Sequence, residues 1–192
     1  MSAEDAACVV LASGLSARFG AADKLQANLC GKPVLRHVLE GVKSVGFGEN
    51  FIVSQGQPPQ NFTFVKNTNP ESGQGHALRL GLTAAHKAGW DCIAVVLGDM
   101  PLITGSHLQA MLHKIEGNST AVSVFRNQKM PPAVFQGEAI SMILDSKSAV
   151  GARSIFSQLK PVTVSISAEE ALDVDTPEDL ARVAAIMKAR KT

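Results

Sequence analysis

Apolar residues along this chain fall into short runs with at most one polar residue, separated by stretches in which they recur with a helical period. The runs are rich in β-branched residues, a composition typical of strands buried on both faces. They are residues 8–11, 51–53, 62–65, 92–97 and 121–125. Because helical stretches alternate with them, the pattern predicts an α/β fold with a mostly parallel sheet and right-handed crossovers.

Residues at the ends of the helical stretches indicate where three helices begin. Pro33 is suited to the first position of a helix whose apolar stripe runs to Val45. Ser106 is suited to cap a helix that extends to Ile115. The segment that begins at Thr176 and Pro177 has an acid three residues after the threonine, which is the pattern of a capping box.

A glycine-punctuated loop with two cations follows the first predicted strand, from Ala12 to Leu25. Gly14 and Gly20 let the backbone turn sharply, so that successive N–H groups can point at an anion, while Arg18 and Lys24 add positive charge. The spacing differs from the P-loop and from the three-glycine dinucleotide pattern. The loop therefore predicts a triphosphate site of another kind, the alternative being a βα turn with an incidental basic pair.

Composition narrows the range of partners and compartments. The chain has 192 residues, a net charge of +1 and no basic cluster, so we expect one domain, 1–192, that binds small molecules and no nucleic acid. The acidic start and the absence of an apolar run near 18 residues favour a cytoplasmic protein that does not bind a membrane. Cys8, Cys30 and Cys92 are widely spaced and are expected to be reduced thiols.

A carboxylate is predicted at the same edge of the sheet as the phosphate loop. Asp99 follows the apolar run 92–97 directly, within the sequence Gly-Asp-Met-Pro. A carboxylate beside bound phosphates is costly unless a cation lies between them, so Asp99 is predicted to bind Mg²⁺. The alternative is an aspartate that merely opens the turn before Pro101.

The opening stretch LASGLSARFGAADKL resembles the signature LAxGxSxRMGxxK of the MobA-like nucleotidyltransferases, with Phe19 in place of methionine. The resemblance implies a three-layer α/β fold with a Rossmann-like nucleotide-binding half, about 6–102, and an acceptor-binding half, about 103–192. It implies catalytic roles for Arg18, Lys24 and Asp99. The residues expected to contact the nucleotide are Leu11, Ala12, Ser13, Gly14, Ser16, Arg18, Lys24, Gly73, Gln74, Gly75 and His76.

Three further segments resemble family motifs. NPESGQGHALRLGL supplies the residues from Gly73 to His76 near the base and ribose, although Ala77 replaces the family's serine and His76 has the alternative role of capping a helix. DVDTPEDL resembles the terminal motif, which makes Asp175 a second Mg²⁺ ligand and Asp173 a lesser candidate. Weaker matches place acceptor contacts at Pro132, Gly151 and Arg153.

Together these residues predict transfer of CMP from CTP to a phosphorylated acceptor, with release of pyrophosphate. The resemblance implies molybdopterin as acceptor and a transient contact with a molybdoenzyme or its maturation factors. Two alternatives stay open: a nucleotidyltransferase for a sugar phosphate or other phosphorylated alcohol, and a non-catalytic protein that delivers a cofactor. CTP is expected over GTP because the side chain of Ser13 narrows the space beside the base. Arg126 and Lys129 are either acceptor-phosphate ligands or solvated surface cations.

Overall fold

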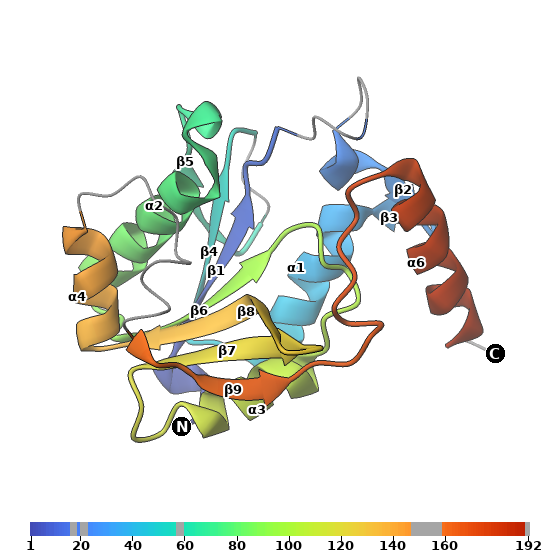
Figure 1. The fold of residues 1–192 in the computed structure, drawn as a ribbon. Coiled ribbons are helices and arrows are strands. Elements are labelled where there is room, and N and C mark those ends of the chain that lie inside the picture. Colours follow the sequence, from blue (N-terminus) through green and yellow to red (C-terminus); the bar gives the residue numbers. More distant parts are fainter. Residues whose placement is uncertain (16–18, 20–22, 57–59, 147–158, 191–192) are drawn as a thin grey trace.

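The computed structural model describes residues 1–15, 19, 23–56, 60–146 and 159–190. Its centre is a seven-stranded sheet in the order β5-β4-β1-β6-β8-β7-β9 (Figure 1). The strands are β1 (Ala7–Ala12), β4 (Glu49–Ser54), β5 (Thr63–Lys66), β6 (Cys92–Leu97), β7 (Thr120–Phe125), β8 (Gln128–Gln136) and β9 (Val162–Ser165). Only β8 runs antiparallel to its neighbours, β6 and β7. The predicted mostly parallel sheet is confirmed.

Helices cover both faces of this sheet. α1 (Val34–Val45) and α3 (Gly105–Lys114) pack on one face, and α2 (Gly73–Lys87) and α4 (Glu138–Asp145) on the other. The side chains of β1 alternate between the two layers: Cys8 and Val10 belong to the first cluster, Val9 and Leu11 to the second. A strand buried on both faces has no polar side, which explains its unbroken apolar run. The predicted three-layer α/β architecture is confirmed.

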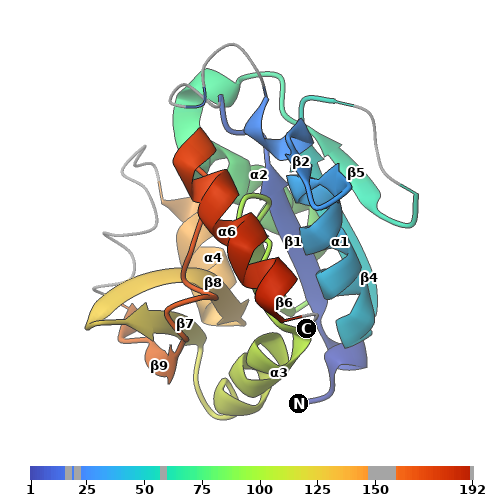
Figure 2. The same ribbon diagram turned by 90° about the vertical axis from the view of Figure 1, so that its right-hand side faces the viewer.

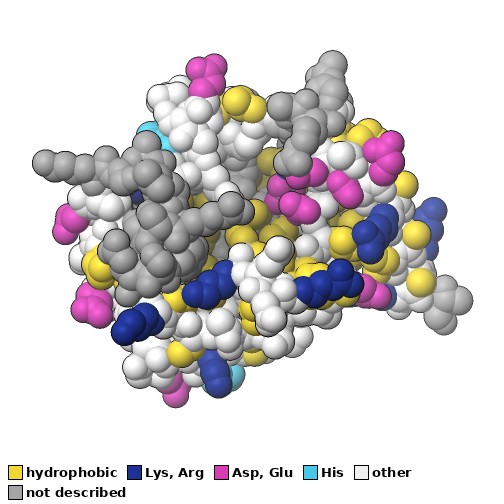
Figure 3. All heavy atoms as spheres, in the orientation of Figure 1, with side chains coloured by type: hydrophobic (Ala, Val, Ile, Leu, Met, Phe, Trp, Pro, Cys, Tyr) yellow, Lys and Arg dark blue, Asp and Glu magenta, His cyan; other side chains and the backbone are white. Residues whose placement is uncertain are grey.

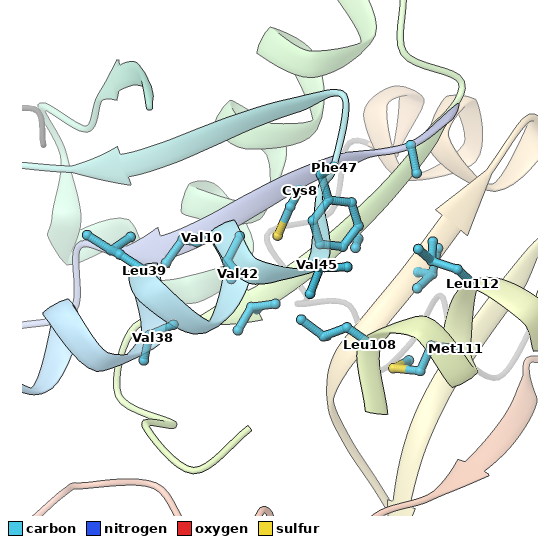
Figure 4. Packing of buried hydrophobic residues seen from close by; sticks show 14 of the residues in the cluster. Cys8, Val10, Val38, Leu39, Val42, Val45, Phe47, Leu108, Met111 and Leu112 are labelled. Carbon is cyan, nitrogen blue, oxygen red and sulfur yellow. The ribbon is translucent and has the colours of Figure 1, made fainter. Parts of the chain in front are cut away.

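α1 shows how the sequence pattern becomes packing. Its buried residues recur at helical spacing and meet the residues of α3 and β1 in one apolar layer (Figure 4). The helix ends at Gly46, which has a φ of 81° and so adopts the left-handed conformation that glycine accepts at little cost. Val38, Leu39, Val42 and Val45 are the residues of the stripe in this layer.

A third apolar cluster packs the carboxyl-terminal helix against residues that follow β1. The ribbon of β2 (Asn28–Leu29) and β3 (Lys32–Pro33) lies beside α6 (Pro177–Ala189), as Figure 2 shows. Leu29, Leu102 and Val183 are all buried in this cluster. The carboxyl-terminal segment is thereby held against the part of the chain that follows β1. Three short 3₁₀ helices complete the described elements: η1 (Ala3–Asp5), η2 (Lys24–Gln26) and η3 (Pro70–Ser72).

Two predicted helix starts were wrong by one or two residues. Pro33 is the N-cap of α1 rather than its first residue, because its ψ angle of 145° is not helical and the residue pairs in β3. Thr104, not Ser106, caps α3, and its hydroxyl accepts a hydrogen bond from the backbone N–H of His107. The capping box of α6, from Thr176 to Asp179, is confirmed.

The two predicted halves share one continuous sheet. β8 comes from the second half of the chain and pairs with β6 of the first half. The division near residue 102 into nucleotide-binding and acceptor-binding halves stays a prediction. Cys8, Cys30 and Cys92 are unpaired, as expected of reduced thiols. Within the described part of the chain, no helix has both the length and the apolar character needed to span a membrane.

Candidate active site

The phosphate loop begins at the carboxyl edge of the two central parallel strands. Leu11 and Ala12 end β1, and Ser13 and Gly14 follow at once. The backbone N–H of Gly98, just after β6, donates to the carbonyl of Leu11 over 2.9 Å. A Cβ at Gly98 would lie 3.2 Å from both that carbonyl oxygen and the Cβ of Ala12, so glycine permits this approach. Asp99 is therefore held next to the loop.

Lys24 lies between the two carboxylates predicted to bind a metal. Its Nζ is 2.6 Å from Oδ2 of Asp99 and 2.6 Å from Oδ1 of Asp175. The three side chains are 11%, 17% and 22% exposed, respectively. Such short distances are typical of charge-assisted hydrogen bonds between an ammonium and a carboxylate. The structure thus brings together three of the predicted site residues from three distant segments.

Backbone contacts explain how Asp175 reaches this place. The N–H of Val174 donates to the carbonyl of Asp99 over 2.9 Å, and the Val174 side chain is fully buried in the third apolar cluster. Oδ2 of Asp179 accepts hydrogen bonds from the backbone N–H of Asp175 and of Thr176. The start of α6 therefore has both a structural cap and a carboxylate directed at the site.

Among the described residues of this cluster, carboxylates outnumber cations: Asp99, Asp173 and Asp175 face Lys24. Burial alone would lower the pKa of Lys24, but the neighbouring Asp99 and Asp175 outweigh it, so the pKa of Lys24 is raised. Burial, followed by repulsion from Asp175 and Asp99, raises the pKa of Asp173. In Figure 3, acidic side chains gather on the rim of a hollow with a largely hydrophobic floor. An environment of this kind favours binding of a further cation.

The donor set fits a small hard cation that retains water and substrate ligands. Oδ1 of Asp99 is buried and makes no hydrogen bond to any described residue, so one carboxylate oxygen is left for a cation. Over the described ranges, no three acidic, histidine or cysteine side chains converge closely enough to form a complete metal site. Asp99 and Asp175 would therefore hold Mg²⁺ together with phosphate oxygens, which is how this ion is usually bound.

Asn67 is a residue of this edge whose role the sequence did not predict. Its Nδ2 donates to Oγ of Ser13 over 2.9 Å, and both residues are buried, at 2% and 6% exposure. The side chain of Gln55 donates to the carbonyl oxygen of Ser13 over 3.3 Å. Asn67 lies two residues before the segment that resembles a family motif, and an asparagine two positions after the predicted strand 62–65 was the available signal.

The predicted base and ribose contacts lie in the first turn of α2. Gly73 begins this helix with a φ of 78°, which favours glycine. Gln74 is exposed and His76 half-buried. Ser72, the N-cap, makes no side-chain capping bond, so the N–H groups of this turn remain suited to bind a ligand. The contacts of Gly73, Gln74, Gly75 and His76 with a nucleotide stay a prediction.

The acceptor side is described only in part. Pro132 is buried in β8, and its carbonyl accepts a hydrogen bond from the hydroxyl of Ser123 over 2.9 Å. Arg126 is at the exposed turn between β7 and β8, with its guanidinium 5.0 Å from the centre of the Phe125 ring. Lys129 is exposed in β8. Four predicted site residues lie outside the described residues: Ser16, Arg18, Gly151 and Arg153.

The fold that carries this site is an α/β fold of the nucleotide-diphospho-sugar transferase type. Residues 8–162 match the profile of the MobA-like NTP transferase domain, and the chain belongs to that family. This membership confirms the resemblance that the opening motif carries.

Relatives identified by sequence match this chain over only part of their own length. The chain is 34% identical over 130 residues to the bifunctional protein GlmU of Streptomyces coelicolor, an alignment that covers 61% of this chain and 27% of GlmU. It is 31% identical over 113 residues to the purine catabolism protein PucB of Bacillus subtilis, covering 57% of this chain and 55% of PucB. The matched region is thus about a quarter of GlmU and about half of PucB.

Solved structures share the fold over nearly the whole chain. Rv0371c of Mycobacterium tuberculosis H37Rv superposes with a TM-score of 0.79 at 20% identity, covering 96% of this chain and 100% of Rv0371c. Molybdopterin-guanine dinucleotide biosynthesis protein A of Archaeoglobus fulgidus gives 0.75 at 18%, covering 95% and 99%. CMP:2-keto-3-deoxy-manno-octonic acid synthetase, solved with CTP, gives 0.74 at 16%, covering 96% and 99%. A further Rv0371c structure is a complex with manganese, with a TM-score of 0.73 at 17% identity, covering 94% and 98%.

Proposed function

We propose that this chain is a Mg²⁺-dependent cytidylyltransferase that transfers CMP from CTP to the phosphate of a molybdopterin and releases pyrophosphate. The observation that carries the proposal is the cluster of Lys24, Asp99 and Asp175 beside the Ser13–Gly14 loop. Ligands of open α/β sheets bind beyond the carboxyl ends of the strands, so a cation and two carboxylates at this edge would be well placed to hold a nucleotide triphosphate and its metal.

The reaction needs positioning and charge neutralisation more than a protein nucleophile. An ionised acceptor phosphate oxygen attacks the α-phosphorus, a new P–O bond forms, and the bond from the α-phosphorus to the bridging oxygen breaks. Pyrophosphate leaves with that electron pair. Lys24 would bind the transferring and leaving phosphates, and Arg18 would add a second cation.

Asp99 and Asp175 would hold Mg²⁺ when the nucleotide is bound. The ion would supply neutralisation of the charge on the phosphate oxygens. The backbone of Ser13 and Gly14 would orient the nucleotide, and the first turn of α2 would offer its N–H groups to the base and ribose. The manganese complex of Rv0371c supports the use of a divalent cation by proteins with this fold.

The acceptor and the nucleotide are supported by different comparisons. The Archaeoglobus protein is described as acting in molybdopterin-guanine dinucleotide biosynthesis, which supports a molybdopterin acceptor. The synthetase solved with CTP supports a cytidine nucleotide, as does the side chain of Ser13. We propose that the enzyme works in the cytoplasm and hands its product to a molybdoenzyme or its maturation factors in a transient contact.

A sugar-type acceptor is the second candidate. The specific observation in its favour is the same synthetase, which is named for a sugar acid and superposes over 96% of this chain. A non-catalytic delivery protein is disfavoured, because a binder that performs no chemistry does not require Lys24, Asp99 and Asp175 to converge.

Pyrophosphate release separates these functions. The protein would be incubated with Mg²⁺, each of the four nucleotides in turn, and molybdopterin, sugar 1-phosphates or no acceptor. Release with CTP and molybdopterin supports the proposal, whereas release with only a sugar phosphate favours the second candidate. Binding of nucleotide without release under any combination would contradict both enzymatic functions.

A further inference from the structure

The ammonium group of Lys24 occupies the space between the two carboxylates to which the proposed function assigns the metal. Both distances are 2.6 Å, and each bond uses a different aspartate. We propose that Lys24 is the internal counter-ion of the nucleotide-free enzyme. The divalent ion then enters only together with a nucleotide, whose phosphates bind the ammonium of Lys24 in place of the two aspartates. The inference rests on the proposed function, since it takes Asp99 and Asp175 as metal ligands.

Burial explains why the empty site needs a counter-ion. Asp99 and Asp175 come from different segments and are only 17% and 22% exposed. Two carboxylates that face one ammonium would repel each other if it were removed, and little water is available to screen them. The same ammonium therefore adds to the backbone hydrogen bond from Val174 to Asp99 in holding the edge of β6 near the start of α6 when neither metal nor nucleotide is bound.

Charge explains why the ammonium and a metal ion disfavour each other. Lys24 takes one oxygen from each aspartate, Oδ2 of Asp99 and Oδ1 of Asp175. A divalent ion on Oδ1 of Asp99, the oxygen that makes no hydrogen bond to a described residue, would still share its carboxylate with the ammonium. Two cations on the same pair of carboxylates repel each other, so binding the metal favours departure of Lys24.

The position of Lys24 in the chain allows its side chain to move without its backbone. Lys24 is the first residue of η2, where Oδ1 of Asp23 accepts a hydrogen bond from the N–H of Leu25 over 2.9 Å. The N–H of Gln26 donates to the carbonyl of Asp23 over 3.0 Å. These contacts hold the backbone of the turn, whereas the flexible four-carbon stem can turn towards phosphate oxygens on the same edge. The nucleotide then supplies the anion that replaces the two carboxylates.

The consequence is a thermodynamic coupling between the metal and the nucleotide. Without a nucleotide, a metal would share these carboxylates with the ammonium of Lys24, and repulsion between the two cations keeps its affinity low. With a nucleotide, the phosphates bind the ammonium and also add ligands to the metal. Each ligand therefore raises the affinity for the other, by the same factor in both directions.

Binding of Mn²⁺ to the nucleotide-free protein tests this coupling, and the paramagnetic resonance signal of free Mn²⁺ is the readout. Lys24→Met removes the charge and keeps most of the stem, and we expect it to tighten Mn²⁺ binding by about tenfold or more relative to wild type. Lys24→Gln is a second variant in case the first does not fold. Lys32→Met is the matched control: it removes an exposed ammonium paired with Glu40, and it should leave Mn²⁺ binding unchanged.

A second substitution shows whether the tighter Mn²⁺ binding of Lys24→Met occurs at Asp99. Adding Asp99→Asn to Lys24→Met should return Mn²⁺ binding to the wild-type level or below it. Unchanged or weaker Mn²⁺ binding in both Lys24 variants overturns the proposed role of Lys24 as counter-ion. Tight binding of Mn²⁺ by the nucleotide-free wild type overturns it as well. Failure of the proposed function is distinguishable, because it appears as absence of pyrophosphate release from the wild type. The Mn²⁺ measurement uses no acceptor and no turnover.

Discussion

The side-chain amide of Asn67 donates a hydrogen bond to the hydroxyl of Ser13, which joins two buried residues 54 positions apart in the chain. Oδ1 of Asn67 also accepts a hydrogen bond from the backbone N–H of Asn69 over 3.0 Å. The backbone N–H of Asn67 donates to the carbonyl of Ser54 over 2.9 Å. Asn67 therefore ties the phosphate loop, the end of β4 and the segment before α2 into one unit.

The contact between Asn67 and Ser13 should be measurable as a coupling energy. Ser13→Ala and Asn67→Ala should each lower the free energy of unfolding by about 1–3 kcal/mol, because each leaves a buried partner unsatisfied. The double variant should cost less than the sum, by about 1 kcal/mol. Urea unfolding measures the stability of all three variants. Asn118→Ala, at an exposed asparagine, is the control, and its effect should add to that of Ser13→Ala. Additive effects of Ser13→Ala and Asn67→Ala would contradict the contact.

Nucleotide choice should depend on the side chain of Ser13. We expect calorimetric titration with Mg²⁺ to show tighter binding of CTP than of GTP, because the Cβ and hydroxyl narrow the space beside the base. Ser13→Gly should reduce the difference, which steric discrimination of this size limits to about 1–3 kcal/mol. Tighter binding of GTP by the wild type would overturn the proposed preference.

Removing the charge of Asp99 should abolish most of the transfer. Asp99→Asn keeps the shape of the side chain, so we expect a fold like that of the wild type and turnover lower by about a hundredfold or more at saturating nucleotide. Circular dichroism checks the fold and pyrophosphate release checks turnover. The exposed Asp5 supplies the control Asp5→Asn, which should retain wild-type activity. If Asp99→Asn keeps nearly full Mg²⁺-dependent activity, Asp99 is only a turn residue.

Two helical glycines should respond in opposite directions to the same substitution. A Cβ at Gly81 in α2 would overlap the side chain of Val9 and lie 3.0 Å from Cγ2 of Val53, whereas at Gly41 in α1 the nearest contact is a carbonyl oxygen 3.6 Å away. Gly81→Ala should therefore destabilise the fold by about 1–3 kcal/mol. Gly41→Ala should stabilise it by about 0.5–1 kcal/mol, because alanine favours the helix. Thermal unfolding of both variants tests the comparison, and a stabilised Gly81→Ala would refute the close packing of α2 on the sheet.

The buried His107 should make the fold sensitive to acid. Burial lowers the pKa of His107, although the carboxylate of Glu170 opposes this in part. Below about pH 6.5 the unfolded chain takes up a proton that the folded protein resists, so stability should fall as pH decreases and stay constant above that value. The ring Nε2 lies 2.8 Å from the hydroxyl of Ser123, and glutamine can replace this contact.

Urea midpoints at about pH 7.5 and about pH 5 measure this effect. His107→Gln should lose less stability between the two conditions than the wild type. His113→Gln changes an exposed histidine of the same helix and should keep the wild-type dependence on pH. An equal loss in His107→Gln and the wild type would show that other groups cause the acid sensitivity.

Local features of this protein could be predicted from its sequence because their causes lie within a few residues. The strand predicted at 92–97 matches β6, because a run of six apolar residues rich in valine and isoleucine suits a strand buried on both faces. The capping box of α6 follows from Thr176 and Asp179, three positions apart. β8 was not predicted as a strand. Its two prolines obscure the strand signal, and its place between β6 and β7 depends on pairing with both.

The candidate site was predicted as a set of residues, and only the tertiary structure decided how they meet. Lys24 lies 75 positions from Asp99 and 151 from Asp175, and no local pattern indicates that one ammonium contacts both carboxylates. That contact requires β1 and β6 to pair in register and α6 to pack on the β2–β3 ribbon. The sequence alone determined which charged groups the site contains, because residue type sets charge. Their pairing depends on the long-range packing that positions them, and that packing places the ammonium of Lys24 between the two predicted metal ligands.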